Sequence, residues 1–364
     1  MSPAPEPLRV DPAPPPGIDL SLFYFAADDP GDREPGGDRY RLLLDGARFA
    51  DAAGLAAVWT PERHFHPFGG RYPNPAVTGA AVAAVTERVA IRAGSVVAPL
   101  HHPLRIAEEW SVVDNISGGR AGVSFASGWH AADFVLAPEA YADRRRLVLE
   151  RAEQVRRLWR GETLTARDGT GAERRVRVHP RPVQPELPIW ITSAGDVRTF
   201  RAAGAMGAGI LTHLLGQDTD DLARKIGEYR AAGGGHVVVM VHTYLGDDED
   251  RVRELVRAPL TRYLRQSLGL LLGSGFDGRR RVDPASLHPD DVEFLVRRSF
   301  ERYYDGGGLL GTPAKARRTA ERLRRAGVDE IACLIDFGLP ADTVLAGLER
   351  ILELRDVGDA RVRD

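Results

Sequence analysis

Several ionisable side chains stand together in the segment Glu62-Arg63-His64-Phe65-His66, directly after an apolar run at residues 55–60. Histidine has an unperturbed pKa near neutrality, so His64 is the candidate for moving protons in this segment. Arg63 stays charged near neutral pH, and we expect it to hold an anion or to pair with Glu62. A polar loop whose histidine only satisfies hydrogen bonds is the alternative interpretation of these residues.

The pair His64 and His66 also has a spacing that suits a metal site, because two imidazoles at a strand end can ligate zinc. His101, His213 and Asp336 are the groups that could complete such a site. A metal-dependent hydrolase is therefore a second interpretation. Against it, the pair follows the second strand of the chain, and no carboxylate or lysine that would bridge two metals is evident.

A third group of residues suits a phosphate. Thr192, Ser193, Ala194 and Gly195 follow an apolar strand and lead into a helix. Small residues in this position present backbone N–H groups to an anion. One such turn is weak support on its own, because many barrels contain one. A metal site at His64 and His66 would not explain it.

Further candidates follow other predicted strands. The predicted strand at 120–126 contains Ser124 and is followed by Ser127, Gly128 and Trp129. The small side chains in this segment expose backbone groups that could bond the polar edge of a cofactor. Trp129 either packs near a cofactor ring or is an ordinary core residue. Thr212 ends another strand and is counted with the cofactor contacts.

The elements that must position these residues alternate between strands and helices. Val89–Pro99 and Arg120–Ala126 are apolar strands, and Leu104–Ile116 between them has helical spacing, which predicts a parallel βαβ unit. Eight such units predict an α/β fold, a closed (β/α)8 TIM barrel that keeps its chemistry at the carboxyl ends of the strands. We expect the eight strands at residues 19–26, 55–60, 89–99, 120–126, 188–192, 208–212, 236–245 and 330–337.

The chain is expected to hold one barrel domain at residues 18–358, between a proline-rich tail or linker at 1–17 and a short tail at 359–364. Two insertions interrupt the barrel, at about 161–187, where an exposed hairpin is expected, and at about 246–308, which should be mostly helical. These insertions are the candidates for subunit contacts or for a lid over the site.

The composition excludes several classes of protein. The net charge is −2, so no overall field favours nucleic acid or a membrane surface. No stretch approaches the roughly 18 apolar residues of a membrane span, and no signal peptide is evident, so we expect a cytoplasmic protein. The single cysteine, Cys333, rules out an internal disulfide and is expected to be a small apolar strand residue. No GxGxxG motif follows a strand, so no NAD(P)H-binding domain is expected in this chain.

Across residues 19–358 the sequence resembles the bacterial-luciferase-like, flavin-dependent monooxygenases. The resemblance is carried by the 89–129 stretch, by WTPERHFHPFGGRYPNP and by ITSAGDVRTFRAAGAMGAGILTHLLGQ. The last two segments are similar to the subgroup that accompanies peptide-synthetase and polyketide-synthase assembly lines in natural-product biosynthesis.

The resemblance implies a two-component monooxygenase. A separate flavin reductase would supply reduced FMN, which would react with O2 through a flavin C4a-peroxide. The substrate would be a hydrophobic or carrier-tethered acyl or aminoacyl group, and the protein would be a homodimer. A deazaflavin-dependent oxidoreductase on the same barrel and a non-catalytic flavin-binding paralogue stay open as alternatives.

The resemblance also assigns residues. It places Ala98 against the isoalloxazine ring and Tyr141, at the start of a long helix, on the flavin phosphate. The luciferases have Glu-His-His-Phe where this chain has Glu62-Arg63-His64-Phe65, and their first histidine is catalytic. Arg63 stands at that position and cannot take over an acid–base role, so His64 is the better candidate.

Overall fold

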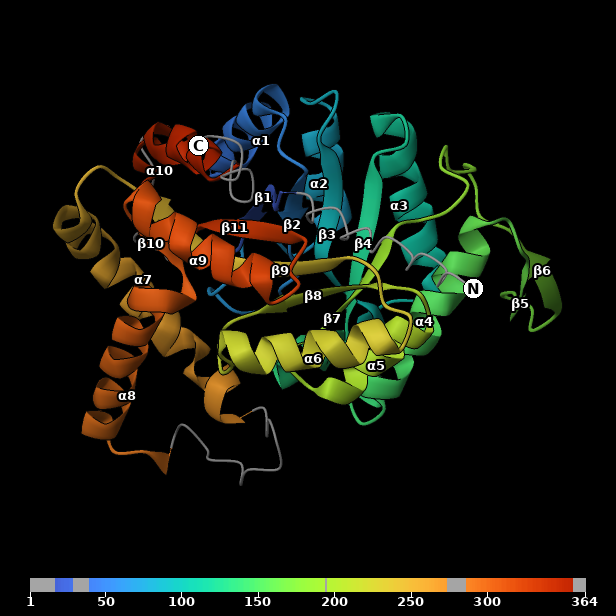
Figure 1. The fold of residues 1–364 in the computed structure, drawn as a ribbon. Coiled ribbons are helices and arrows are strands. Elements are labelled where there is room, and N and C mark those ends of the chain that lie inside the picture. The colour runs from blue at the N-terminus through green and yellow to red at the C-terminus, as the bar shows by residue number, and fades with distance from the viewer. Residues whose placement is uncertain (1–16, 29–38, 194, 274–285, 356–364) are drawn as a thin grey trace, which may run out of the picture.

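The computed structural model describes residues 17–28, 39–193, 195–273 and 286–355. The predicted tails, apart from Gly17, and Ala194 of the predicted phosphate turn lie outside the described residues. Within these ranges the chain forms one parallel barrel wrapped by helices, with two insertions at its periphery (Figure 1).

The barrel is closed by eight parallel strands in the described ranges, as the sequence predicts. Each strand pairs with its neighbours in chain order, and β9 closes the ring by pairing with both β8 and β11. The strands are β1 (Asp19–Tyr24), β2 (Ala57–Thr60), β3 (Ala90–Val97), β4 (Ala121–Ala126), β7 (Ile189–Thr192), β8 (Gly209–His213), β9 (Val237–Leu245) and β11 (Glu330–Asp336).

One short strand was not predicted. β10 (Leu309–Gly311) pairs in parallel with the end of β9, outside the ring. Three residues are too few to show an alternating or apolar pattern, so the sequence gives no signal for it.

Helices cover the outside of the barrel, and α3 (Pro103–Ser117) shows why they form where they do. Pro103 occupies its first turn, where a missing N–H costs nothing, and His102 accepts a hydrogen bond from Leu104 N at 3.2 Å. The helix ends at Gly118, whose φ of 68° is left-handed. The other covering helices are α1 (Arg41–Ala53), α2 (Pro75–Ala83), α4 (Arg144–Trp159), α5 (Val197–Ala205), α6 (Thr219–Ala231), α9 (Pro313–Arg325), α10 (Ala341–Gly347) and the 3-10 segment η7 (Leu348–Leu354).

Two predicted boundaries are wrong near the site. The strand expected to reach Pro99 ends at Val97, and η1 (Ala98–Leu100) follows as a 3-10 turn. The long helix expected to have Tyr141 at its start begins only at Arg144, after the 3-10 turns η2 (Ala131–Leu136) and η3 (Pro138–Ala140). Tyr141 packs edge-on against Phe134, with ring centroids 4.9 Å apart, so this segment folds back on itself before the helix begins.

The insertions have the predicted character. Residues 161–187 contain an antiparallel hairpin of β5 (Leu164–Arg167) and β6 (Glu173–Val176), seen at the right edge of Figure 1. Residues 246–308 contain α7 (Glu249–Gly273), α8 (Pro289–Arg302) and the π-helical turn η6 (Tyr303–Gly307), on the opposite side of the barrel.

The molecule has an apolar core and an apolar surface area. Cys333 is fully buried on β11, as predicted.

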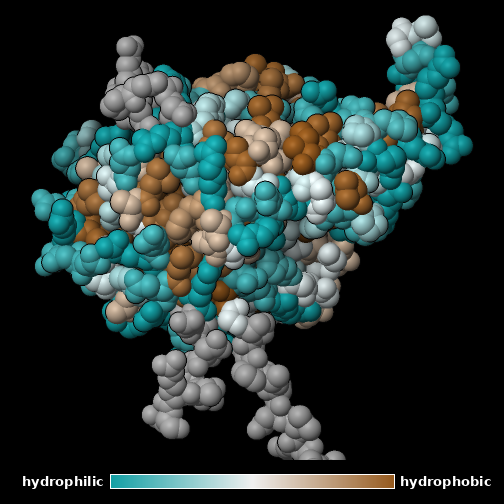
Figure 2. All heavy atoms as spheres, turned by 90° about the horizontal axis from the view of Figure 1, so that it is seen from above, coloured by the Kyte–Doolittle hydropathy of each residue, from teal (hydrophilic) through white to brown (hydrophobic). Residues whose placement is uncertain are grey.

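On the side of α1, α2 and α3, brown patches interrupt the polar surface (Figure 2). We use the name α2–α3 surface for the exposed side chains of Val77, Val112, Ile116 and Val183. Among the helices described, none has the length and apolar character needed to cross a membrane.

Candidate functional site

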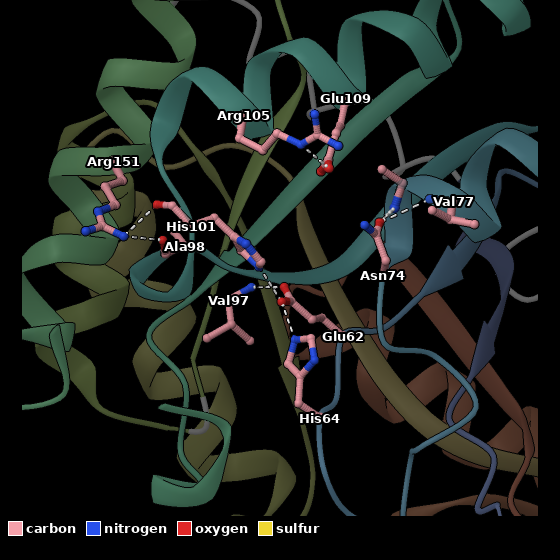
Figure 3. Close-up of polar contacts among 11 residues, drawn as sticks. Glu62, His64, Asn74, Val77, Val97, Ala98, His101, Arg105, Glu109 and Arg151 are labelled. Carbon is pink, nitrogen blue, oxygen red and sulfur yellow. Dashed lines mark hydrogen bonds and ion pairs between the residues drawn. The ribbon is translucent and has the colours of Figure 1, made fainter. Parts of the chain in front are cut away.

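A buried carboxylate at the carboxyl end of β2 binds two histidines. Glu62 Oε1 lies 2.8 Å from His64 Nε2 and is also hydrogen-bonded to His101 Nε2. The second carboxylate oxygen, Oε2, accepts a hydrogen bond of 2.7 Å from Val97 N at the end of β3 (Figure 3). The structure therefore brings the predicted Glu62 and His64 together and adds His101.

The charges in this group stabilise one another. Burial favours a neutral Glu62, but the hydrogen bonds from His101 and His64 outweigh it, and the pKa of Glu62 lies below its ordinary value. Burial lowers the pKa of His101, but the hydrogen bond to Glu62 and the charges of Glu62 and Glu109 together outweigh it, and the pKa of His101 is raised. Glu62 thus favours the protonated form of His101, and His101 favours the ionised form of Glu62.

Arg63 has a different partner from the predicted one. Its guanidinium forms an ion pair with Asp133, both side chains are buried, and the pairing with Glu62 is wrong. Glu62 instead faces the two histidines. The Arg63 guanidinium also lies 5.1 Å from the centre of the Trp129 ring. Asp133 was missed, and its one signal is a lone acidic residue in the apolar run Ala131–Leu136.

Small hydroxyl side chains from three neighbouring strands meet at the same end of the barrel. Thr192 Oγ1 lies 2.7 Å from Ser124 Oγ and is also hydrogen-bonded to Ser95 Oγ. Two of these residues were predicted. Ser95 was missed, although a lone serine within the apolar strand β3 is a signal that could have identified it. Ala98, the first residue after β3, is fully buried.

The loop after β4 has a constrained backbone. Gly128 has a φ of 74°, and a Cβ atom there would lie 2.8 Å from both Phe134 Cε2 and Val97 Cγ1. Trp129 is 38% exposed, so its interpretation as an ordinary core residue is wrong. Ser127 is half-buried beside it.

Tyr141 lies three residues before α4, in the turn that precedes the helix. Its ring packs on Phe134, and the Arg144 guanidinium lies 4.2 Å from the ring centre. The predicted position at the start of the helix is therefore wrong by one turn, while the residue remains next to a positive charge.

The predicted phosphate turn lies against a buried lysine. Gly195 has a φ of 120°, and a Cβ atom there would lie 3.0 Å from Lys225 Nζ, so the turn backbone runs close to the ammonium group. Lys225 is buried, and its Nζ donates to Gln217 Oε1 at 3.0 Å and to Asp221. Gln217 in turn donates to Thr212 Oγ1 at 3.1 Å.

An ammonium group has three N–H donors, and among the described residues two acceptors, Gln217 and Asp221, are hydrogen-bonded to Lys225. The positive charge of this buried group suits a phosphate. Asp196 opposes this in part, because it already caps α5 by accepting from Arg198 N at 3.0 Å. Sequence reasoning missed Lys225, which lies in the amphipathic helix α6, and Gln217, which lies in the loop before that helix.

The predicted metal site is not assembled. His66 Nδ1 accepts a hydrogen bond from Phe68 N at 3.0 Å, and Asp336 Oδ2 accepts one from Tyr72 at 2.7 Å. His213 Nδ1 accepts from Leu215 N, and burial lowers the pKa of His213 to about 4. In the described ranges the donor atoms of Glu62, His64 and His101 lie within 4.8 Å of one another. Both Nε2 atoms are taken up by hydrogen bonds to one oxygen, so we describe this group as a hydrogen-bonded network.

Comparisons with known proteins identify the family. Residues 19–358 match the sequence model of the family described as luciferase-like monooxygenase. The chain is 25% identical over 329 residues to the oxygenase component of the flavin-dependent trigonelline monooxygenase of Acinetobacter baylyi, covering 86% of this chain and 88% of that protein. It is 27% identical to limonene 1,2-monooxygenase of Rhodococcus erythropolis, covering 75% of this chain and 69% of that protein.

Solved structures share the fold. A monooxygenase from Streptomyces bottropensis superposes with a TM-score of 0.74 at 24% identity, covering 92% of this chain and 98% of that one. The oxygenating constituent of 3,6-diketocamphane monooxygenase from Pseudomonas putida, in complex with FMN, superposes with a TM-score of 0.71 at 19% identity, covering 93% and 98%. At these identities the likeness establishes the (β/α)8 barrel.

Proposed function

Because this chain belongs to the luciferase-like monooxygenase family, we propose that it is the oxygenase component of a two-component system that uses reduced FMN and O2. The trigonelline relative is itself an oxygenase component, which supports a separate flavin reductase as partner. The lack of a GxGxxG motif after a strand in the sequence supports the same division of labour.

The observation that carries this proposal is that two chemically different groups lie on the same end of the barrel. Glu62, His64 and His101 follow β2 and β3 and can hold or move a proton. Gly195, in the turn after β7, and Lys225, in α6, can hold an anion. A cofactor with a phosphate at one end and a reacting ring at the other would need both groups.

In this proposal Ser193, Gly195 and Lys225 hold the FMN phosphate, and Tyr141 approaches it from the turn before α4. The backbone of Gly128 and the side chains of Ser124, Ser127 and Thr192 would face the polar part of the ring. Ala98, Trp129 and Thr212 complete the candidate contacts. The bound flavin would supply the chemistry that activates O2.

The protein's own contribution to the reaction is proton control and exclusion of water. His64 is the proposed acid–base residue, and Glu62 fixes its ring through the 2.8 Å hydrogen bond. Arg63 is committed to Asp133 and lies against Trp129, so its proposed role is to hold the loop after β4 in place.

The proposed substrate is a hydrophobic or carrier-tethered acyl or aminoacyl group from natural-product biosynthesis. The resemblance to the assembly-line subgroup supports it. A cluster of aromatic rings also supports it. The ring centroid of Phe68 lies 5.0 Å from that of Phe25 and 4.8 Å from that of Tyr263 in the α7 insertion. A Cβ on Gly69 would touch both Phe25 and Arg63, so this aromatic wall adjoins the site.

The proposed quaternary structure is a homodimer. The α2–α3 surface places Val77, Val112, Ile116 and Val183 in solvent, and burying such side chains in a second copy would remove this apolar area from water. Light scattering after size-exclusion chromatography would measure the mass. A monomer at micromolar concentration would contradict the proposal.

A stopped-flow experiment tests the proposed function. Purified protein with reduced FMN is mixed with oxygenated buffer, and absorbance is followed against free reduced FMN in the same buffer. A transient species that precedes oxidised FMN, and that is absent without protein, is the expected result. If reduced FMN does not bind at all, while a reduced deazaflavin does, the deazaflavin alternative replaces the proposal. Binding of neither flavin would reject both.

A further inference from the structure

A pocket lies outside the barrel wall, against the pair formed by Glu62 and His101. It is small, with room for about one water molecule, and lies where the start of α2 meets the first turns of α3. Asn74 and Glu109 give it a polar lining, and Glu109 is paired with Arg105 at 2.7 Å (Figure 3). Solvent in this pocket can therefore reach polar groups next to the buried carboxylate.

The three side chains of the network differ in their access to that solvent. The His101 side chain is 29% exposed and lines the pocket, whereas the Glu62 side chain is 1% exposed. His64 lies on the far side of Glu62 and is 12% exposed. His101 is thus the group of the three that is best placed to exchange a proton with water in the pocket.

The geometry also fixes the three groups relative to one another. Both Nε2 atoms bond the same oxygen, Glu62 Oε1, and Val97 N holds Oε2 so that the carboxylate keeps its orientation. Arg151 donates to His101 O at 2.6 Å and anchors the backbone of that residue. One oxygen atom therefore separates the imidazole at the pocket from the imidazole after β2.

We propose that His101 and Glu62 form a proton relay between this pocket and His64. The inference rests on the proposed function, in which His64 is the acid–base residue. His101 and Glu62 act through His64 and do not touch the substrate, so they are positioning residues.

Each transfer in the relay is balanced. A proton from pocket water bonds to His101 Nδ1, and the proton on His101 Nε2 passes to Glu62 Oε1. The proton on Oε1 then passes to His64 Nε2, and His64 Nδ1 releases its proton to the reacting group. One proton enters and one leaves, and no electrons are exchanged. Transfer to His64 starts from the tautomer that carries its proton on Nδ1 and leaves Nε2 free to accept. In the tautomer that donates Nε2–H to Glu62, His64 must first move that proton to Nδ1 before the relay can run.

The alternative is that His64, His101 and Val97 N only satisfy the hydrogen-bonding needs of a buried Glu62 carboxylate and that no proton is transferred between them. Under both interpretations the protonation of His64 depends on His101, because both rings share Oε1. The two interpretations differ in whether a proton crosses Oε1, which the rate measurements below separate. The other charged groups that act on His101 are Glu109, which favours its protonated form, and Arg151, which opposes it.

The first experiment needs no flavin, so it is independent of the proposed function. The full chain is labelled with 15N-histidine, and the side-chain nitrogens are followed by NMR as the pH is changed. We expect the titration of His64 in the wild type to shift with that of His101, and this shift to disappear in both His101→Gln and Glu62→Gln. A His64 titration that is the same in the wild type and in His101→Gln overturns the relay.

The second experiment restores the missing ring. In His101→Gly with reduced FMN and O2, formation of oxidised FMN should slow by about tenfold or more, since proton transfer by a positioned side chain contributes at least that much. Imidazole added to the solution should restore the rate. A series of substituted imidazoles should restore it in the order of their pKa values, because proton donation follows acid strength.

An added imidazole that only fills the space left by the His101 ring would restore the structure whatever its pKa. A rate that depends on the size of the added imidazole but not on its pKa therefore overturns the relay. His102→Gln is the matched control, because the neighbouring His102 only caps α3, and its rate should match the wild type. Circular dichroism checks that each variant is folded. If wild-type protein does not bind reduced FMN, the proposed function fails, and the NMR titration still tests the coupling between the two histidines that the relay requires.

Discussion

Lys225 Nζ lies 3.0 Å from the point that a Cβ atom on Gly195 would occupy. The two residues come from α6 and from the turn after β7, so the barrel brings a buried ammonium group to the backbone that the sequence marks as a phosphate turn. Asp221 and Gln217 use two of the three donors of Lys225. Within the described ranges no acceptor takes the third, and in the proposed function it donates to a phosphate oxygen.

Removing this charge should weaken FMN binding and spare riboflavin, which lacks the phosphate. In Lys225→Met we expect the Kd of reduced FMN to rise about 10- to 100-fold, which corresponds to the about 1.5–3 kcal/mol of a hydrogen bond to a charged group. The Kd of reduced riboflavin should stay unchanged. Anaerobic titration calorimetry measures both.

The control is Lys315→Met, at the second of the two lysines, which pairs with Glu249 at 2.8 Å on another part of the barrel. It should leave both Kd values as in the wild type. Lys225→Arg should restore part of the FMN affinity. A parallel loss of FMN and riboflavin affinity in Lys225→Met would indicate a structural role for the pair with Asp221.

Gly128 is required by the backbone after β4. Its φ is 74°, and a Cβ atom there would lie 2.8 Å from Phe134 and Val97. Gly128→Ala should therefore lower the free energy of unfolding by about 1–3 kcal/mol, the usual cost of a strained backbone position. Urea denaturation measures it. The control is Gly169→Ala on the β5–β6 hairpin, where no atom lies within 4 Å, and equal stability losses in both variants would contradict the argument.

Much of the fold could be predicted because strand and helix periods and helix-ending glycines are local signals. The sequence places all eight barrel strands, and Gly118 ends α3 in the left-handed conformation that glycine adopts readily. The errors lie where contacts between separate segments matter. The segment before α4 forms 3-10 turns in which Tyr141 packs on Phe134, and no local pattern indicates that contact.

The candidate site was predictable to the same extent. Glu62 and His64 lie at a strand end, where a barrel makes residues converge, and the sequence contains that information. Arg63 pairs with Asp133, which is 70 residues away, and Lys225 reaches Gly195 from another helix. Such partners depend on the three-dimensional path of the chain, so the residue types near a strand end do not identify them.

The buried pair of Arg63 and Asp133 should be costly to break. Arg63→Met leaves Asp133 without its cation in a buried position, so we expect a loss of about 3–5 kcal/mol in the free energy of unfolding. Combining it with Asp133→Leu should recover a large part of that loss, because no buried charge is then left unpaired. Urea denaturation of both variants and of Asp133→Leu gives the coupling. Additive losses would contradict a direct pair.

The network of Glu62 and His101 should make stability depend on pH in a defined window. The pKa of Glu62 is lowered in the folded state, so its contribution is present above its ordinary value of 4.5 and is lost as the pH falls through the folded value. The pKa of His101 is raised, so its contribution is complete below its ordinary value of 6.5 and is lost as the pH rises through the folded value. The pair should therefore stabilise the fold most between pH 4.5 and 6.5. Urea denaturation at a series of pH values should show the difference between wild type and His101→Gln to be largest in that window, whereas a difference that is constant with pH would show that the pair contributes no charge-dependent stability.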